Sequence, residues 1–238
     1  NNNNNIIIII IINNWFNYNI RKFIRCYWSN YAKEIESAAT KETQATHINH
    51  SMALANRIAL ITGASSGIGL ATAKLFARQG CKVAATGRNQ NALDKLVQDI
   101  EAEGGIAKAF SGDVTNDNDV SNVVSSVVKE FGGLNILVNN AGVLKGGTTD
   151  AVDMANFDFN MSVNARAVFC FIQNCVPHLK ESNDSSIVNV SSVNGIQSFG
   201  GCMSYCASKA ACDMIMRCAS VDLAPYGIRV NNVNPGVV

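Results

Sequence analysis

Three residues near the carboxyl end of the chain have the types and the spacing needed for proton transfer. Tyr205 and Lys209 lie four residues apart, and Ser192 lies 13 positions before Tyr205. Side chains four apart share one face of a helix, so the ammonium of Lys209 would lie beside the phenol of Tyr205 and stabilise its phenolate. A free tyrosine titrates near pH ~10, too high for a base at neutral pH. The trio predicts redox chemistry on a carbonyl or alcohol if a nucleotide site precedes it; alone, such a pair is usually a solvated helix face.

A glycine-rich turn supplies the candidate nucleotide site. It follows a short apolar run at residues 57–61 that is rich in β-branched side chains, and it precedes a helical pattern that begins near Leu70. Its spacing, Gly-x-x-x-Gly-x-Gly, differs from the standard dinucleotide fingerprint. Glycines let the backbone approach a pyrophosphate, and unpaired N–H groups at the helix start face the anion. We expect cofactor contacts from Thr62, Gly63, Ser65, Ser66, Gly67, Ile68 and Gly69.

Strand-like runs alternate with helical patterns along the chain, which is typical of βαβ units and a parallel sheet. We therefore predict an α/β fold, with a doubly wound parallel sheet in a single domain. Ligands of such sheets bind at the carboxyl ends of the strands, near the reversal of strand order. The predicted strands are 57–61, 81–86, 106–110, 134–139, 186–191 and 228–233. Helices are expected near 70–76, 87–103, 113–131, 150–157, 163–181 (bent or interrupted at Pro177) and 205–223.

Several motifs in this order resemble the short-chain dehydrogenase/reductase family, or SDR family, from about residue 57 to the last residue. They are the glycine turn at 62–69, Asn139-Asn140-Ala141-Gly142, Asn164, Ser192, Tyr205-x-x-x-Lys209 and Pro235-Gly236. The general look is similar to the 3-oxoacyl carrier-protein reductases. The resemblance implies a Rossmann fold and an oxidoreductase that transfers a hydride between a nicotinamide cofactor and a carbonyl or secondary alcohol.

The resemblance also implies a role for each catalytic residue. Tyr205 would give a proton to the substrate oxygen or remove it, and Ser192 would bind that oxygen. Lys209 would assist Tyr205 and bind the nicotinamide ribose. Asn164 would hold a water that links Lys209 to solvent, although it could instead be a helix-interior amide satisfied locally. Ser191 is a neighbouring alternative to Ser192, but the 13-residue interval favours Ser192.

The cofactor choice depends on Gly87 and Arg88 after the second predicted strand. An acidic residue there would bind the ribose hydroxyls of NAD, whereas Arg88 can pair with the 2′-phosphate of NADP. Many NADP-binding relatives carry a second basic residue at the position that Ser66 occupies here. Arg88 therefore favours NADP over NAD, without that second contact. The resemblance implies further cofactor contacts at Asp113 and Val114 (adenine), at Asn140, Ala141 and Gly142 (ribose, unless the Asn side chains brace the turn), and at Pro235, Gly236 and Val238.

The first 51 residues differ in composition from the rest. Residues 1–20 hold nine Asn and eight Ile, and the run of seven Ile is too short for the ~20 residues that span a bilayer. We interpret residues 1–51 as an AT-rich leader translated upstream of Met52; a disordered or targeting tail is the alternative. Residues 52–238 then form the Rossmann domain, with 14 Lys and Arg against 15 Asp and Glu. This balance does not suggest a nucleic-acid or membrane surface.

The cysteine pattern fits reduced thiols of a cytoplasmic protein. The eight cysteines include no Cys-x-x-Cys pair and no neighbouring His, so no metal is expected. The resemblance further implies a homodimer or homotetramer. The family continues beyond Pro235-Gly236 with a substrate-covering loop and a seventh strand, so we expect an incomplete carboxyl end with the strand-six side of the sheet left open.

Two rival functions remain. The segment 63–67 also fits Gly-x-Ser-x-Gly, the nucleophile elbow of serine hydrolases, with Ser65 as nucleophile. That chemistry needs a histidine, and His178 is the one that follows residue 51. The second rival is a catalytically silent NADP-binding or oligomeric scaffold protein.

Overall fold

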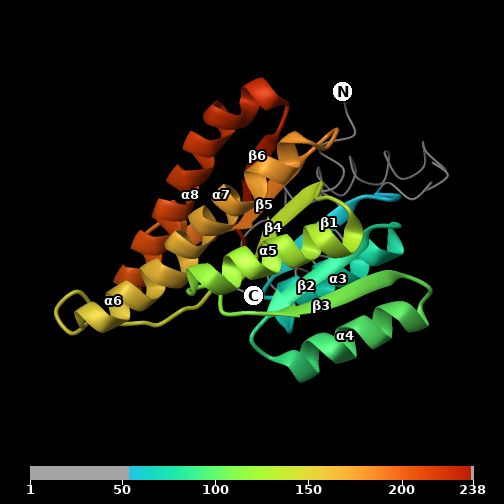
Figure 1. The fold of residues 1–238 in the computed structure, drawn as a ribbon. Helices are drawn as coiled ribbons and strands as arrows, with labels where there is room; N and C mark the ends of the chain where they lie inside the picture. The colour runs from blue at the N-terminus through green and yellow to red at the C-terminus, as the bar shows by residue number, and fades with distance from the viewer. Residues whose placement is uncertain (1–53, 237–238) are drawn as a thin grey trace, which may run out of the picture. The chain divides into compact units, whose positions relative to one another are not determined.

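Six parallel strands form one sheet in the order β3-β2-β1-β4-β5-β6 (Figure 1). The computed structural model describes residues 54–236. Strand order reverses between β1 and β4, and the predicted doubly wound α/β fold is confirmed. Each predicted strand lies within two residues of the observed one at both ends. The strands are β1 (Ile58–Thr62), β2 (Lys82–Gly87), β3 (Ile106–Ser111), β4 (Ile136–Asn139), β5 (Ser186–Val190) and β6 (Arg229–Val233).

Helices cover both faces of the sheet because right-handed crossovers place them on opposite faces when the strand order reverses. One face carries α3 (Gly67–Arg78) and α4 (Gln90–Ala102), which pack on each other. The other face carries α5 (Asp117–Phe131), α7 (Ala167–Lys180) and α8 (Met203–Leu223) (Figure 1). The main hydrophobic cluster, which includes Val124, Phe171 and Leu137, lies between this second layer and the sheet.

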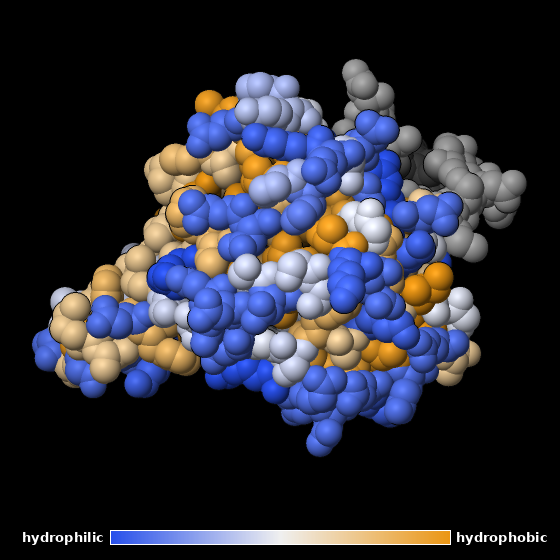
Figure 2. All heavy atoms as spheres, viewed as in Figure 1, coloured by the Kyte–Doolittle hydropathy of each residue, from blue (hydrophilic) through white to orange (hydrophobic). Residues whose placement is uncertain are grey.

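The central strand β1 is buried along its whole length, as expected for a parallel strand covered on both faces. In the edge strand β3, by contrast, Ile106, Lys108 and Ser111 are exposed and only Ala107 is buried. Hydrophilic side chains cover most of the front face, over α5 and α4, while hydrophobic colours gather over the end that carries α6 (Met154–Met161) (Figure 2). No helix within residues 54–236 is long and apolar enough to cross a bilayer.

The region predicted as two separate helices is continuous, and this prediction was wrong. A π-helical turn, η2 (Ser162–Arg166), joins α6 to α7. Pro177 lies inside α7 without ending it, because Cys175 and Leu179 on either side are fully buried and hold the last turn against the core. The interpretation of residues 1–51 and the contact assigned to Val238 lie outside the described residues.

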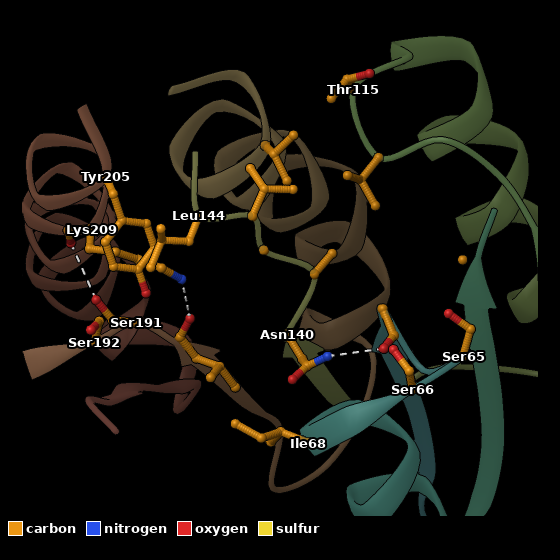
Figure 3. Close-up of a pocket in the computed structure, with 18 of the residues that line it drawn as sticks. Ser65, Ser66, Ile68, Thr115, Asn140, Leu144, Ser191, Ser192, Tyr205 and Lys209 are labelled. Carbon is orange, nitrogen blue, oxygen red and sulfur yellow. Dashed lines mark hydrogen bonds between the residues drawn. The ribbon is translucent and has the colours of Figure 1, made fainter. Parts of the chain in front are cut away.

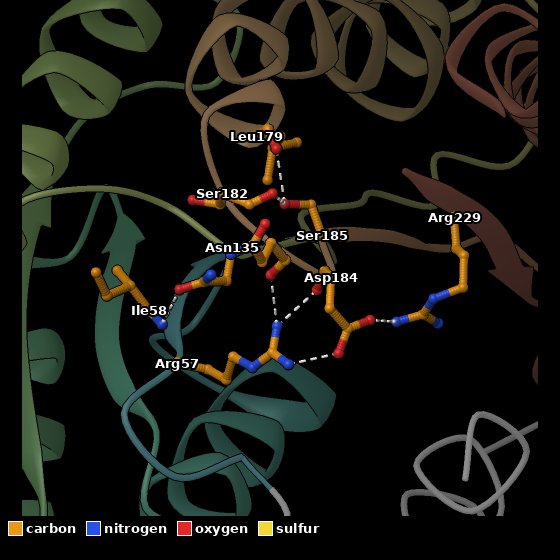
Figure 4. A network of polar contacts seen from close by, with 9 residues as sticks. Arg57, Ile58, Asn135, Leu179, Ser182, Asp184, Ser185 and Arg229 are labelled. Atoms are coloured by element: carbon orange, nitrogen blue, oxygen red, sulfur yellow. Dashed lines mark hydrogen bonds and ion pairs between the residues drawn. The ribbon is translucent and has the colours of Figure 1, made fainter. Parts of the chain in front are cut away.

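An arginine clamp ties together the amino ends of three strands (Figure 4). Arg57, just before β1, donates from Nη1 to the carbonyl oxygens of Asn183 and Asp184 at 3.0 and 2.7 Å, and its Nη2 contacts the Asp184 carboxylate. Arg229, at the start of β6, reaches the other Asp184 oxygen at 3.3 Å. Asp184 adopts a left-handed conformation with φ 58, which directs its carboxylate and carbonyl toward Arg57 at the entry to β5.

Replacing Arg57 by Ala should lower the free energy of unfolding by about 1–2 kcal/mol, because charge-assisted hydrogen bonds to two carbonyls and a carboxylate are lost. Chemical denaturation measures the change. Arg217→Ala is the matched control, since Arg217 is exposed on α8, and should change stability by less than about 0.5 kcal/mol. Equal stability of the two variants would show that the clamp contributes nothing.

Candidate active site

A cleft of about 530 Å³ opens at the carboxyl ends of the strands, where the strand order reverses (Figure 3). Tyr205, Lys209 and Ser192 lie on one side of it, and Ser65, Ser66 and Ile68 on the other. The fold thus brings together most of the site residues expected from the sequence. Those that line the cleft are Gly63, Ser65, Ser66, Ile68, Arg88, Asp113, Val114, Asn140, Ala141, Gly142, Ser192, Tyr205, Lys209, Pro235 and Gly236.

Four expected residues, Thr62, Gly67, Gly69 and Asn164, do not line the cleft but shape its walls. Thr62 is buried at the end of β1, and its Oγ1 accepts hydrogen bonds from the N–H groups of Asn140 and Ala141, both at 2.9 Å. Gly67 has φ 55, a conformation that other residues rarely adopt. These residues set the path of the backbone around the cleft.

The glycine turn packs tightly against Asn140. The Asn140 side-chain amide donates to the carbonyls of Thr62 and Gly63 at 2.9 and 3.2 Å, so this side chain braces the turn. A Cβ at Gly69 would lie 2.4 Å from both the Asn140 Nδ2 and the Gly63 oxygen. Only glycine permits this approach, and it brings the start of α3 against the end of β1.

The amino end of α3 is open to an anion. Ser66 precedes the helix in extended conformation, its side chain makes no capping hydrogen bond, and the first turn contains no acidic residue. The first N–H groups of a helix without a side-chain cap are suited to a phosphate. With the cleft beside it, this end fits the diphosphate of a dinucleotide.

Arg88 and Asp113 lie at the far end of the cleft, after β2 and β3. Asp113 accepts hydrogen bonds from the Thr115 N–H and hydroxyl at 2.9 and 2.8 Å. The Thr115 N–H lowers the pKa of Asp113, and the Arg88 guanidinium acts in the same direction. Arg88 is exposed, so its charge is available to a ligand at this end.

Tyr205 and Lys209 lie one turn apart in the first part of α8. The Lys209 ammonium lies 5.8 Å from the centroid of the Tyr205 ring and donates to the Val190 carbonyl at 2.8 Å. Lys209 is 4 % exposed, and burial lowers its pKa, while Cys212 and Asp213 act in the opposite direction. A buried cation thus lies beside the phenol, in the arrangement that the four-residue spacing predicts.

The two candidate serines make different contacts. Ser191 donates its hydroxyl to the Lys209 carbonyl at 3.3 Å and so bonds to α8. Ser192 Oγ accepts from the Asn194 N–H at 3.1 Å, which leaves its own hydroxyl proton free to donate into the cleft. The contacts therefore favour Ser192 over Ser191 as the donor to a bound substrate.

Asn164 lies in η2 and is fully buried. Its Nδ2 donates to the Val143 carbonyl at 2.8 Å and to Ser208 Oγ at 2.9 Å, and its Oδ1 accepts from the Val143 N–H at 2.9 Å. A Cβ at Gly142 would lie 3.4 Å from both the Asn164 Oδ1 and the Lys209 Nζ. The amide is therefore satisfied by protein groups, yet Oδ1 accepts only one hydrogen bond and retains a second lone pair.

Buried and partly buried amides connect the sheet to α8. Asn139, Asn189 and Asn232 form a chain of hydrogen bonds across β4, β5 and β6 at 2.9 and 2.8 Å. The chain continues to the Asp213 carboxylate on α8 at 2.6 Å. Asn234 donates both to Asp213 and, at 2.9 Å, to the Ser192 carbonyl. This network fixes the end of β5 and the Lys209 turn of α8 relative to each other.

Sequence reasoning missed several residues that line the cleft, among them Leu144, Phe159 and Val190. Val143 and Leu144 follow the Asn-Asn-Ala-Gly turn, and two apolar residues between glycine-rich and polar segments are a signal that could have identified Leu144. Val190 could be recognised only from the fold, because its carbonyl rather than its side chain contacts Lys209.

The geometry does not support a serine hydrolase. Ser65 follows the carboxyl end of β1, whereas His178 lies in the last turn of α7, which leads into the amino end of β5. All strands are parallel, so Ser65 lies at the carboxyl ends of the strands and His178 near their amino ends, on opposite sides of the sheet's length. Within residues 54–236, no group of three or more His, Cys, Asp or Glu side chains is arranged to hold a metal ion.

Replacing Gly69 by Ala should weaken NADPH binding about ten-fold or more and destabilise the fold by about 1–3 kcal/mol, because the new methyl group would force the Gly63 backbone and Asn140 apart. Fluorescence titration and chemical denaturation measure the two effects. Gly133→Ala is the matched control, since a Cβ there meets its nearest atoms only at 4.0 Å. Normal cofactor affinity in Gly69→Ala would contradict the close packing.

Known proteins share this arrangement. The short chain dehydrogenase family profile matches residues 57–238. The chain is 37% identical over 183 residues to 2,5-dichloro-2,5-cyclohexadiene-1,4-diol dehydrogenase of Sphingobium indicum, covering 77% of this chain and 73% of that one. It is 38% identical to the 3-oxoacyl-[acyl-carrier-protein] reductase of Thermotoga maritima, covering 79% and 76%. A short chain dehydrogenase structure from Burkholderia cenocepacia in complex with NADP is similar with a TM-score of 0.74 at 38% identity, covering 77% and 75%. This chain belongs to the short chain dehydrogenase family of oxidoreductases.

Proposed function

We propose that this protein is an NADP(H)-dependent oxidoreductase that interconverts a carbonyl and a secondary alcohol, with Tyr205 as general acid and base. The observation that carries the proposal is the buried ammonium of Lys209, 5.8 Å from the Tyr205 ring in a cleft at the reversal of strand order. The glycine turn and the uncapped start of α3 fit a dinucleotide in the same cleft.

The cleft residues provide the proton transfer. A nicotinamide cofactor bound here would supply or accept the hydride. In the direction of reduction, the free hydroxyl proton of Ser192 orients the carbonyl oxygen and the Tyr205 phenol donates its proton to that oxygen. Lys209 stabilises the phenolate that remains. The remaining lone pair of Asn164 Oδ1 would hold a water through which Tyr205 and Lys209 recover a proton from solvent.

Tyr205→Phe should lower kcat for ketone reduction by a factor of about 10² to 10⁴, because only the proton donor is removed. NADPH oxidation followed by absorbance measures the rate. NADPH binding serves as the internal control and should change little, since the ring remains. Near-normal turnover by Tyr205→Phe would refute the mechanism, and binding without turnover in the unmodified protein would point to a silent NADP-binding protein.

The preference for NADP rests on the charge at the ends of β2 and β3. Gly87 offers no carboxylate to the adenosine ribose, and the exposed guanidinium of Arg88 lines the cleft beside it. Guanidinium groups pair with phosphate through two parallel hydrogen bonds, so Arg88 suits a 2′-phosphate. The NADP in the Burkholderia cenocepacia structure supports this preference by similarity.

Arg88→Asp should raise the Kd for NADPH about ten-fold or more and shift the preference toward NADH, because a carboxylate repels the 2′-phosphate and accepts ribose hydroxyls. Steady-state kinetics with both cofactors measure the shift. Lys108→Asp makes the same charge change at an exposed position on the edge strand β3 and should leave the preference unaltered. An unchanged preference in Arg88→Asp would contradict the assignment.

A homodimer or homotetramer and a cytoplasmic location stay proposals. Exposed apolar side chains on α7 and α8, at Phe169, Met214 and Val221, support contact between copies of the chain. The seven cysteines of the part of the chain that the structure describes are all free thiols, which supports a reducing location.

A further inference from the structure

Three asparagines at four-residue intervals, Asn156, Asn160 and Asn164, form what we call the asparagine ladder along α6 and η2. Asn164 pairs with Val143 as one peptide pairs with another in a sheet, accepting from its N–H and donating to its carbonyl. Asn160 makes the same pair of hydrogen bonds with Lys145, at 3.3 and 3.1 Å. Asn156 donates to the Gly146 carbonyl at 2.9 Å. The ladder holds segment 143–146 along the helix surface.

The ladder is buried, and each of its amides both donates and accepts hydrogen bonds. Asn160 and Asn164 are 0 % exposed, and Asn156 is 6 % exposed. The Asn160 Nδ2 also donates to the Asn156 carbonyl and side-chain oxygens at 3.0 and 2.9 Å. Buried amides are costly unless they are hydrogen-bonded, so any other path of segment 143–146 would leave several polar groups without partners. The ladder thus imposes one backbone conformation on this segment.

The segment runs beside the start of α8. At one end, Gly142 approaches the Lys209 ammonium, and at the other the Gly147 N–H donates to the Gly201 carbonyl at 2.8 Å. Leu144 lies between these points, lines the cleft, and is 62 % exposed. Figure 3 shows its side chain next to Tyr205. Phe159, adjacent to Asn160 and 39 % exposed, adds a second apolar surface to the cleft.

We propose that Leu144 is a specificity-determining residue that contacts an apolar substituent on the reacting carbon of the substrate, and that Asn160 is the positioning residue that holds Leu144 there. The inference rests on the proposed carbonyl chemistry of the same cleft. A single exposed leucine is ordinary on a protein surface, but this one has both neighbouring residues fixed by buried amides and lies beside the proton donor.

The test compares reduction of cyclohexanone, an apolar ring, with reduction of acetone, using NADPH and the full chain. The ratio of the two kcat/KM values does not depend on the fraction of folded enzyme. Leu144→Ala should lower this ratio about ten-fold. Asn160→Ala should also lower this ratio. In a protein that already carries Leu144→Ala, adding Asn160→Ala should lower the ratio by less than about two-fold, because the effects of coupled residues are not additive. Ile106→Ala, at a 50 % exposed position on the edge strand β3 outside the cleft lining, is the matched control and should leave the ratio unchanged.

An unchanged ratio in Leu144→Ala would overturn the specificity role. If Asn160→Ala lowers the ratio as much in the Leu144→Ala protein as in the unmodified protein, the positioning role is overturned. Amide hydrogen exchange tests positioning without substrate: residues 143–147 should exchange about ten-fold faster in Asn160→Ala, and unaltered exchange would overturn it.

If the unmodified protein reduces neither ketone, the proposed reaction fails for these substrates, and calorimetry of cyclohexanone binding to the NADPH-loaded protein becomes the readout. Weaker binding by Leu144→Ala than by the unmodified protein supports the inference. Equal binding by both, or no binding by either, overturns it.

Discussion

The contact among Gly63, Gly69 and Asn140 is the constraint on which the cleft depends. It lies between β1 and β4, the neighbouring strands at which strand order reverses. The Asn140 amide donates to both the Thr62 and the Gly63 carbonyls, and the missing Cβ of Gly69 lets α3 begin directly above them. Any larger group there would push α3 away from the sheet and widen the distance between the amino end of α3 and the Tyr205 and Lys209 side chains on α8.

Neutral amides, more than ion pairs, hold the two sides of Tyr205 in place. On one side, the chain from Asn139 to Asn232 and Asp213 connects the ends of three strands to α8. On the other side, the asparagine ladder fixes the segment that carries Leu144. The ion pairs within residues 54–236 lie at partly or fully exposed side chains away from the cleft. Directional hydrogen bonds hold the asparagine ladder without a charged group, whereas the chain on the other side ends at the Asp213 carboxylate.

Local sequence patterns were sufficient to predict the fold, and together with the family resemblance they identified most of the expected residues that line the cleft. Alternating apolar runs and helical periods identified all six strands, and the strand-to-helix position of the glycine turn located the cleft. The spacing of Tyr205 and Lys209 predicted their adjacency because it depends on one helix alone. The sequence does not decide whether the Asn140 side chain braces the turn, because the two carbonyls that it bonds lie 77 and 78 residues away in sequence.

The ladder shows why the rest could not be predicted. Its spacing of four is visible in the sequence, but its partner is an irregular segment without any period, so nothing local indicates the pairing. The same tertiary contacts explain why α6 and α7 are joined rather than separated by a loop. Asn160 and Asn164 both bond to segment 143–146, and the π-helical turn at Ser162–Arg166 continues the helix from α6 into α7. Proline disfavours a helix interior, which predicts a bend or a break at Pro177, but the core packing of Cys175 and Leu179 overrides this preference.

The asparagine ladder has a consequence for how the protein responds to its surroundings. Side-chain amides neither gain nor lose protons between mildly acidic and mildly alkaline solution. The hydrogen bonds that hold segment 143–146 against α6 and η2 therefore do not change with acidity in this range. The shape of this wall of the cleft is set by groups that carry no charge.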